Sequence, residues 1–333
     1  MDNYIVLDLE WNQSADGKEG AVEHFPFEII EIGAVKLNGS MEETDSFHRL
    51  IRPVVYTEIH SKISEVTHLE AEVLEQEGGR FPEIIKEFIE WCGNDAVFCT
   101  WGSMDLTELQ RNMAYFGVEI PFPKPFLYYD VQKLYSLLCG DGKAKQSLDV
   151  TVEELGILED RPFHRAFDDA HYTGRVMAAM DFGAVRDYWS VDYYRLPKSP
   201  EEEIYLVFPT YSKYVSRTFE TKEDAIADKT VTDLICCRCN RMLRKKIRWF
   251  SVNQKFYFAL GICPEHGWLK GKIRMKRSDD GKVYVVKTMK LVDEEGARQI
   301  YEKKEEARKK RVERTKMKRL HKKETEQENK IPY

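Results

Sequence analysis

The sequence predicts an α/β fold with one central mixed sheet flanked by helices, followed by a small β domain and a basic helical tail. Strand-like runs come first, between residues 4 and 51, and strand and helix periodicities then alternate up to residue 180. Residues 1–199 carry 18 Lys and Arg against 36 Asp and Glu, whereas residues 200–333 carry 33 against 21. These opposite net charges indicate two domains, of which the basic one either contacts a polyanion or contains only a solvated charged helix.

The composition is typical of a soluble protein in a reducing compartment. Of the 333 residues, 42% are hydrophobic and 32% are charged, and the apolar runs are far shorter than a membrane span. The N-terminus shows no basic and apolar segment of the kind that directs secretion. Three of the seven cysteines lie close together, at positions 236, 237 and 239. This spacing favours metal-binding thiolates over disulfides, and we expect a cytoplasmic location.

The first domain is expected to span residues 1–196. Strands are predicted over residues 4–11, 27–37, 47–51, 96–101 and 126–131. Helices are predicted from Ile63 to Leu74, from Pro82 to Trp91, over residues 106–116, from Ser147 or Asp149 to Leu155, and over residues 164–180.

Residues 197–203 are expected to form a linker, because proline and charged residues concentrate there. A β domain should follow over residues 204–292, with strand-like runs at 204–208, 249–260 and 283–286. Residues 293–333 consist mainly of Glu, Lys and Arg and are predicted to form a charged helix that ends in a disordered tail.

Asp8 and Glu10 follow the apolar run Tyr4–Leu7 of the first strand. Residues two apart on a strand point to the same side, so the two carboxylates project together. Without a partner they would repel each other, and each pKa would rise. A divalent cation removes this cost, and hard oxygen ligands suit Mg²⁺ or Mn²⁺. The alternative is that Asp-x-Glu only ends a strand at the solvent.

Two further acidic positions follow along the chain. Asp105 comes after a buried strand, where it would either join a site at the sheet edge or cap the next helix. His164 and Asp169 lie at the entry to the last helix and can approach one point, unless they form only an acidic helix start beside a surface histidine. Four carboxylates can hold two cations about 4 Å apart that clamp a phosphodiester, and a histidine can accept a proton from the attacking water.

These motifs, in this order, resemble those of the DEDDh family of 3′-to-5′ exonucleases. Asp8 and Glu10 match the first motif, Asp105 in Trp-Gly-Ser-Met-Asp matches the second, and His164 with Asp169 matches the third. Residues 28–35 and 63–69 are also similar to the family, and the second motif favours the branch of small-RNA and histone-mRNA exoribonucleases and KapD-like bacterial exonucleases. The resemblance covers about residues 1–182. It implies a ribonuclease H-like fold, two Mg²⁺ or Mn²⁺ ions and His164 as the general base.

The resemblance also suggests residues that contact the substrate. In relatives, the segment matched by Thr67, His68 and Leu69 approaches the terminal nucleotide, although Leu69 fits a core position equally well. Trp11 stands where the family often has a small residue, so the sugar and base pocket would differ. The expected substrate-binding set also includes two residues of the first and second motifs, Leu9 and Met104.

The second domain contains a Cys-x-x-Cys and, 23 residues later, a Cys-x-x-His. Cys236, Cys239, Cys263 and His266 would together make a tetrahedral set for one structural Zn²⁺, with a zinc ribbon between the two pairs. A small β unit with little core gains much of its folding free energy from such a metal. Cys237 competes for a ligand position, and the alternative is a group of buried thiols beside a surface histidine.

Basic and aromatic residues alternate around these cysteines. The basic residues are Arg238, Arg241, Arg244, Lys245, Lys246, Arg248, Lys270, Lys272, Arg274, Lys276 and Arg277, and the aromatic residues are Trp249, Phe250, Phe256, Tyr257 and Trp268. Cations for phosphates and rings for stacking are typical of nucleic-acid binding, but the rings would serve a β core equally well.

The sequence therefore predicts a metal-dependent 3′–5′ exonuclease that acts on the 3′ end of single-stranded RNA or DNA. One alternative is a non-catalytic nucleic-acid-binding or adaptor protein on the same fold, although the complete set of carboxylates argues against it. A second alternative is a structure-specific endonuclease of the ribonuclease H type, against which His164 argues. The choice between RNA and DNA stays open at this point.

Overall fold

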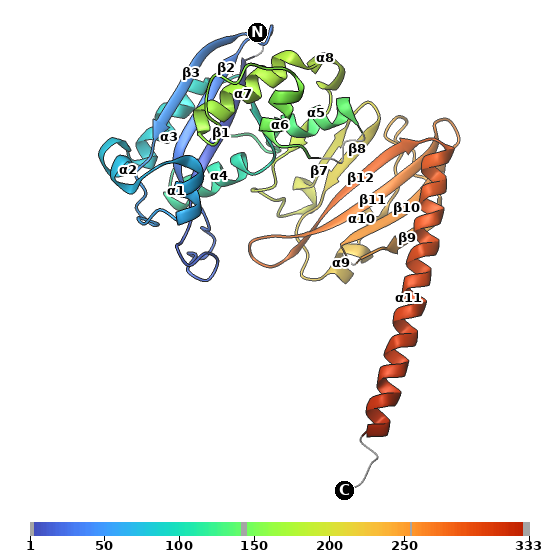
Figure 1. Ribbon diagram of the computed structural model, residues 1–333. Coiled ribbons are helices and arrows are strands. Elements are labelled where there is room, and N and C mark those ends of the chain that lie inside the picture. Colours follow the sequence, from blue (N-terminus) through green and yellow to red (C-terminus); the bar gives the residue numbers. More distant parts are fainter. Residues whose placement is uncertain (1–2, 141–144, 254, 329–333) are drawn as a thin grey trace. The chain divides into compact units, whose positions relative to one another are not determined.

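The computed structural model describes residues 3–140, 145–253 and 255–328, with side chains up to residue 317. The chain divides into two compact units, Met1–Arg195 and Leu196–Tyr333 (Figure 1). Among the described residues, no helix has both the length and the apolar character needed to cross a membrane. The last residues of the predicted disordered tail, 329–333, lie outside the described part of the chain.

The described residues of the first unit form a mixed sheet of six strands in the order β3-β2-β1-β4-β5-β6. The two pairs β1–β4 and β4–β5 are parallel, and the other neighbours are antiparallel. The strands are β1 Asn3–Asn12, β2 Glu28–Leu37, β3 Glu43–Leu50, β4 Ala96–Thr100, β5 Leu127–Asp130 and β6 Ser190–Val191. The predicted mixed α/β class is therefore confirmed for this unit.

Helices cover both faces of this sheet (Figure 1). They are α1 Ser61–Thr67, α2 Ala71–Glu77, α3 Phe81–Cys92, α4 Asp105–Tyr115, α5 Val131–Cys139, α6 Leu148–Glu154, α7 Ala166–Ala179 and α8 Phe182–Val185. Ile5, Leu7 and Leu9 of β1 pack in one core cluster with α3 and α4. Tyr4 and Val6 belong to the other cluster, with α5, α6 and α7. The two sides of β1 therefore face different helices, as alternation along a strand requires.

The single helix predicted from Ile63 to Leu74 is wrong, because the chain forms α1 and α2 with a break at His68. The backbone of His68 is left-handed, with φ of 56°, and its N–H donates to the carbonyl of Ser64. The Thr67 hydroxyl accepts the N–H of Leu69. Leu69 itself is buried in a core cluster, so the apolar spacing continues although the helix does not.

The described part of the second unit forms a six-stranded antiparallel sheet in the order β7-β8-β12-β11-β10-β9. Its strands are β7 Ile204–Val207, β8 Tyr211–Val215, β9 Lys245–Ser251, β10 Phe256–Cys263, β11 Gly267–Arg277 and β12 Val283–Val292. Its helices are η1 Pro200–Glu202, α9 Lys222–Ala227, α10 Lys229–Thr232 and α11 Glu294–Glu328. A zinc ribbon between the Cys-x-x-Cys and Cys-x-x-His pairs would account only for β9 and β10, so the sheet is larger than the sequence suggested.

The run over residues 249–260 was predicted as one strand, but it contains the turn between β9 and β10. The Asn253 side chain closes this turn by accepting the N–H of Phe256. One face of the sheet packs against α9, α10 and the cysteine segment. On the other face, Ala297 and Ile300 of α11 pack against β9 and β10. Beyond these first turns the described side chains of α11 are almost all exposed.

Candidate active site

Strand β1 directs Asp8 and Glu10 to the face of the sheet that α7 covers. The odd-numbered residues Leu7 and Leu9 enter the core beneath α3 and α4. The even-numbered residue Val6 packs on the opposite side, in the cluster that contains α7. Because successive side chains of a strand alternate, Asp8 and Glu10 continue the row that Val6 begins.

Helix α7 approaches the sheet closely at Gly33, the β2 residue that pairs with Asp8. A Cβ atom on Gly33 would lie 2.1 Å from the carbonyl carbon of Ala166 and from the nitrogen of Phe167. No other residue type fits there without moving the helix. The start of α7 therefore lies against the sheet beside Asp8, and this position brings Asp169 to β1.

The carboxylates of Asp8, Glu10 and Asp169 form one cluster. Each offers an oxygen, and these oxygens all lie within 4.8 Å of one another. All three side chains are partly buried. Three acidic groups at this separation, shielded from bulk water, are a suitable ligand set for a hard divalent cation.

Burial raises the pKa of each member of this cluster, and neighbouring negative charges add to the shift. Burial is the largest cause for Asp8, whose pKa lies well above its ordinary value, and the charges of Asp105 and Glu10 add to it. Burial and the charge of Asp169 raise the pKa of Glu10 to about 8. Burial raises the pKa of Asp169 to about 6, although the backbone N–H of His164 opposes the shift. The site therefore disfavours full ionisation unless positive charge is added.

Asp105 adds a fourth carboxylate next to this cluster. It is the first residue of α4 and is 5% exposed. Its pKa rises to about 7 through burial, despite hydrogen bonds from its own backbone N–H and that of Leu9. Its charge is the largest electrostatic influence on Asp8. Asp105 thus belongs to the same acidic centre, although its oxygens lie outside the group of three.

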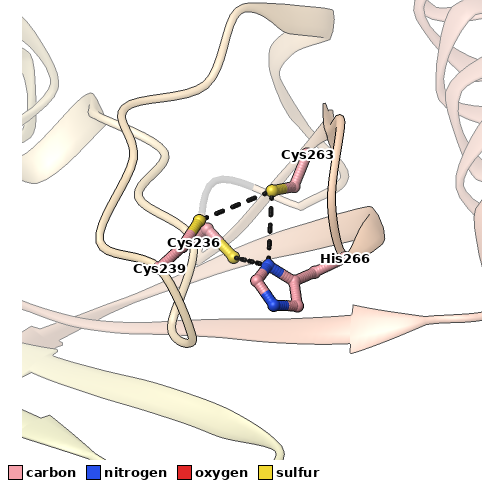
Figure 2. A group of neighbouring side chains, drawn as sticks. All are labelled: Cys236, Cys239, Cys263 and His266. Carbon is pink, nitrogen blue, oxygen red and sulfur yellow. Dashed lines mark hydrogen bonds between the residues drawn. The ribbon is translucent and has the colours of Figure 1, made fainter.

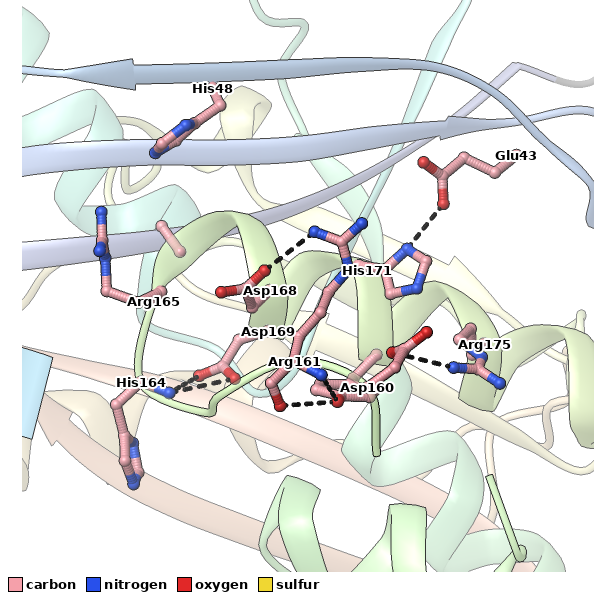
Figure 3. Close-up of polar contacts among 12 residues, drawn as sticks. Glu43, His48, Asp160, Arg161, His164, Arg165, Asp168, Asp169, His171 and Arg175 are labelled. Atoms are coloured by element: carbon pink, nitrogen blue, oxygen red, sulfur yellow. Dashed lines mark hydrogen bonds and ion pairs between the residues drawn. The ribbon is translucent and has the colours of Figure 1, made fainter. Parts of the chain in front are cut away.

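His164 is held near Asp169 through its main chain. Its backbone is left-handed, with φ of 68°, and its N–H lies 3.3 Å from each carboxylate oxygen of Asp169. Its side chain is exposed. Figure 3 shows the imidazole ring directed away from the Asp169 carboxylate. The structure therefore brings the His164 backbone, rather than its ring, to the acidic cluster.

Glu31 and Arg165 form a buried ion pair beside the cluster that sequence reasoning did not assign to the site. Arg165 donates from Nε and Nη2 to the Glu31 carboxylate at 3.0 and 2.9 Å, and His48 Nε2 lies 2.6 Å from it. Burial alone would raise the pKa of Glu31, but these hydrogen bonds lower it below its ordinary value. The charge of Arg165 also partly offsets the rise in the pKa of Glu10, the residue that pairs with Glu31 between β1 and β2. A glutamate between apolar residues, in the run Ile29-Ile30-Glu31-Ile32, was the available signal.

Comparison with known families identifies the fold that carries this acidic centre. A family model described as "RNase_T: Exonuclease" matches residues 5–177, which is just over half of the chain. The chain belongs to the exonuclease family. The resemblance to DEDDh exonucleases and the ribonuclease H-like fold of the first unit are thereby confirmed.

Solved structures similar to the exonuclease domain show low sequence identity. The nuclease domain of 3′hExo, a DEDDh family member bound to rAMP, is 22% identical, covers 57% of this chain and 96% of its own, and has a TM-score of 0.47. Cell-death related nuclease 4 is 16% identical, with coverages of 58% and 66% and a TM-score of 0.46. Pop2p of S. pombe, in a Mg²⁺- and Mn²⁺-bound form, is 14% identical, with coverages of 56% and 83% and a TM-score of 0.41. No curated protein matches the chain.

The residues expected to contact substrate differ in accessibility within the exonuclease domain. Met104 is 46% exposed, and His68 is also exposed. Trp11 is partly buried, with its ring 5.7 Å from that of Phe27. The other three expected residues, Leu9, Thr67 and Leu69, are buried. Leu9 and Leu69 pack in core clusters, and the Thr67 hydroxyl makes hydrogen bonds within its own segment. Their expected roles in substrate binding remain predictions.

The second unit gathers Cys236, Cys239, Cys263 and His266 at one point (Figure 2). The Nδ1 atom of His266 lies 3.6 Å from the Sγ atoms of both Cys236 and Cys263. The Sγ atoms of Cys239 and Cys263 are also 3.6 Å apart. Burial alone would raise the pKa of Cys263, but hydrogen bonds from the Glu265 backbone and the His266 ring lower it to about 6. A thiol with this pKa is readily available as a thiolate ligand. Cys237, the competing cysteine, lies outside the group.

The raised pKa values of the acidic centre predict that stability depends on pH and on divalent cations. Between the ordinary pKa of about 4.5 and the folded value of about 8, Glu10 binds more protons in the folded chain than in the unfolded one. The free energy of unfolding should therefore fall as pH rises through this window. Added Mg²⁺ should reverse the loss, most strongly at pH 8. Thermal unfolding from pH 5 to 8, with and without Mg²⁺, measures both effects.

Glu10→Gln should flatten this pH dependence, and the exposed control Glu65→Gln should leave it as in the wild type. If the stabilisation by Mg²⁺ is equal at pH 5 and pH 8, the carboxylates do not bind the cation.

Proposed function

We propose that the chain is a divalent-cation-dependent 3′–5′ exonuclease that hydrolyses phosphodiester bonds of single-stranded RNA or DNA. The observation that supports this most directly is the convergence of Asp8, Glu10 and Asp169 within 4.8 Å beside the buried Asp105. A binding protein without activity would have no need to keep four carboxylates whose pKa values are raised, chiefly by burial.

The acidic centre fits one or two ions of Mg²⁺ or Mn²⁺, of which we propose two. Its donors are carboxylate oxygens, which these cations prefer over sulfur and nitrogen. When bound, the cations would supply positive charge that activates the attacking water and stabilises the leaving oxygen. Asp8, Glu10, Asp105 and Asp169 would hold them. The Glu31–Arg165 pair would hold the start of α7 against β2, and hence Asp169 beside β1.

We assign the role of general base to His164. Its backbone is fixed at the entry to α7 by the hydrogen bond to Asp169, while its ring is exposed to solvent. A neutral imidazole at this point can accept the proton of the attacking water once the ring turns toward the bound phosphate. In a structure without substrate, a catalytic side chain need not yet adopt its working orientation.

For the second unit we propose one structural Zn²⁺ held by Cys236, Cys239, Cys263 and His266. Three thiolates and one imidazole form a set typical of closed tetrahedral zinc sites. The cluster joins the segment before β9 to the turn between β10 and β11. Zinc there would tie the knuckle-like segment to the sheet, and its binding would contribute to the folding of this unit. The basic residues of the unit would contact the nucleic acid.

Product analysis tests the proposed activity and its direction. Single-stranded RNA and DNA of one sequence, labelled at the 5′ end, should shorten stepwise in the presence of Mg²⁺ or Mn²⁺. Asp8→Asn, Glu10→Gln and Asp169→Asn should each abolish shortening, because each removes a cation ligand. The exposed control Asp16→Asn should keep it. Immediate release of the 5′ label as a mononucleotide, or full activity in any of the three variants, would contradict the proposal.

His164→Ala should lower the rate of hydrolysis by about 10²–10⁴-fold, because the attacking water loses its proton acceptor. Affinity for the oligonucleotide and for Mn²⁺ should change little. His24→Ala, which removes another exposed histidine, provides the matched control in the same single-turnover assay. A loss of less than threefold in His164→Ala would exclude the ring from the chemistry.

Metal analysis tests the zinc site. The purified chain should contain one zinc per molecule, and Cys263→Ser should lose it and expose residues around 234–270 to hydrogen exchange. Cys237→Ser is the matched control, since this cysteine is buried but lies outside the ligand group. It should retain the zinc. Full zinc content in Cys263→Ser, or its loss in Cys237→Ser, would contradict the ligand assignment.

A further inference from the structure

The second unit contains a basic pocket away from its cysteine cluster. The pocket has a volume of about 440 Å³ and lies where the β9–β10 turn, the end of β11 and the start of α9 meet. Its cationic lining residues are Lys222, Lys255, Arg274, Lys276 and Arg277. Asn253 also lines it, and none of the described lining residues is acidic. We refer to this site as the basic pocket.

The strand arrangement explains how so many cations reach one hollow. Strand β11 continues past Arg274, the residue that pairs with the first residue of β10, Phe256. Side chains from both faces of β11 can therefore reach the space beside the β9–β10 turn. The N–H of Met275 donates to the carbonyl of Lys255, which joins β11 to the residue just before β10.

Three carboxylates close in sequence to the basic pocket have partners outside it. Glu220 pairs with Lys282 at 2.9 Å. Asp224 closes the capping box with Thr221, and Asp280 accepts the hydroxyl of Ser278. In the described part of the chain, no ion pair involves any of four lining cations, Lys222, Lys255, Arg274 and Arg277. Like charges gathered in this way repel one another until a polyanion binds.

We infer that the basic pocket binds the phosphodiester backbone of the single-stranded nucleic acid on which the exonuclease domain acts. Arginine guanidinium groups match phosphate geometry through paired N–H donors, and two of the lining cations are arginines. The hollow is larger than one phosphate ion and has room for a nucleotide unit. The guanidinium of Arg274, one of the lining residues, lies 5.9 Å from the centre of the Phe256 ring. A ring next to phosphate-binding cations suits a single strand, whose bases stack on aromatic side chains.

This inference rests on the proposed function only for the identity of the anion. The pocket lies entirely within the second unit, and its residues are separate from the carboxylates of the acidic centre. It would add affinity for strands long enough to occupy it, while the chemistry would stay with the exonuclease domain.

Binding measured against salt concentration tests the basic pocket. The variant Arg274→Gln/Arg277→Gln is compared with Lys229→Gln/Lys309→Gln, which removes two exposed cations of the same unit outside the pocket. Both are made on the Asp8→Asn background so that one single-stranded oligonucleotide stays intact. The pocket variant should bind more weakly, and the slope of log Kd against log salt should become shallower by about 1.4, or about 0.7 per phosphate contact. The control should retain the slope.

Equal slopes for the pocket variant and the control would overturn the inference, and the pocket would then suit an acidic protein partner instead. Thermal unfolding checks that each variant is folded. If the double variant is unfolded, Lys255→Gln replaces it, and the slope of log Kd against log salt should then become shallower by about 0.7. Dinucleotide cleavage by the wild-type chain is measured separately. If the dinucleotide is not cleaved but the slope changes, the proposed function is rejected and the inference about the basic pocket stands. If the dinucleotide is cleaved but the slope does not change, the proposed function stands and the inference is rejected.

Discussion

The contact between α7 and β2 at Gly33 is the constraint on which the acidic centre depends. Because position 33 has no side chain, the helix start lies directly against the sheet at the residue paired with Asp8. This contact brings Asp169, which is distant in sequence, to the two carboxylates that β1 already presents on one side. The ion pair between Glu31 of β2 and Arg165, the residue before α7, then ties the start of the helix to β2. The fold thus concentrates negative charge where burial makes it unfavourable, and a bound cation would relieve this cost.

The two units of the chain gather ligands of different chemistry. The exonuclease domain presents carboxylate oxygens, which suit cations such as Mg²⁺ that take part in phosphoryl chemistry. The second unit presents three thiols and an imidazole, which suit Zn²⁺ in a closed structural site. The oxygen ligands stand on strand β1 and on the first turns of helices α4 and α7. The sulfur ligands stand on a loop and a hairpin turn, where a metal would contribute most to local order.

Much of the first unit could be predicted because apolar periodicity marks its strands and the motif residues follow them directly. The alternation along β1 correctly placed Asp8 and Glu10 on one side. Other features depend on contacts that a local pattern does not contain. The break at His68 arises from a left-handed backbone, whereas the apolar spacing continues through Leu69. The role of Gly33 follows from packing against α7, which begins 133 residues later at Ala166.

The second unit was harder to predict for a related reason. Its strand β11 carries Lys270, Lys272, Arg274 and Lys276 in alternation with core residues, and the sequence reasoning interpreted this pattern as a basic surface. The turn between β9 and β10 falls inside an aromatic run, where Asn253 is its main local signal. The Glu31–Arg165 pair was missed because its partners are far apart in sequence and only the fold brings them together. The basic pocket is likewise assembled from a helix start, a turn and a strand end.

The central claim is that the convergence of β1 and α7 creates a divalent-cation site, and direct measurement of Mn²⁺ binding tests it. Free Mn²⁺ is followed by electron paramagnetic resonance at neutral pH, in the wild type and in Asp8→Asn/Asp169→Asn. The account predicts Mn²⁺ binding to the wild type and a loss of affinity in the variant greater than the roughly 10- to 100-fold expected for loss of an outer-shell partner. Equal Mn²⁺ affinity in the two proteins would contradict it.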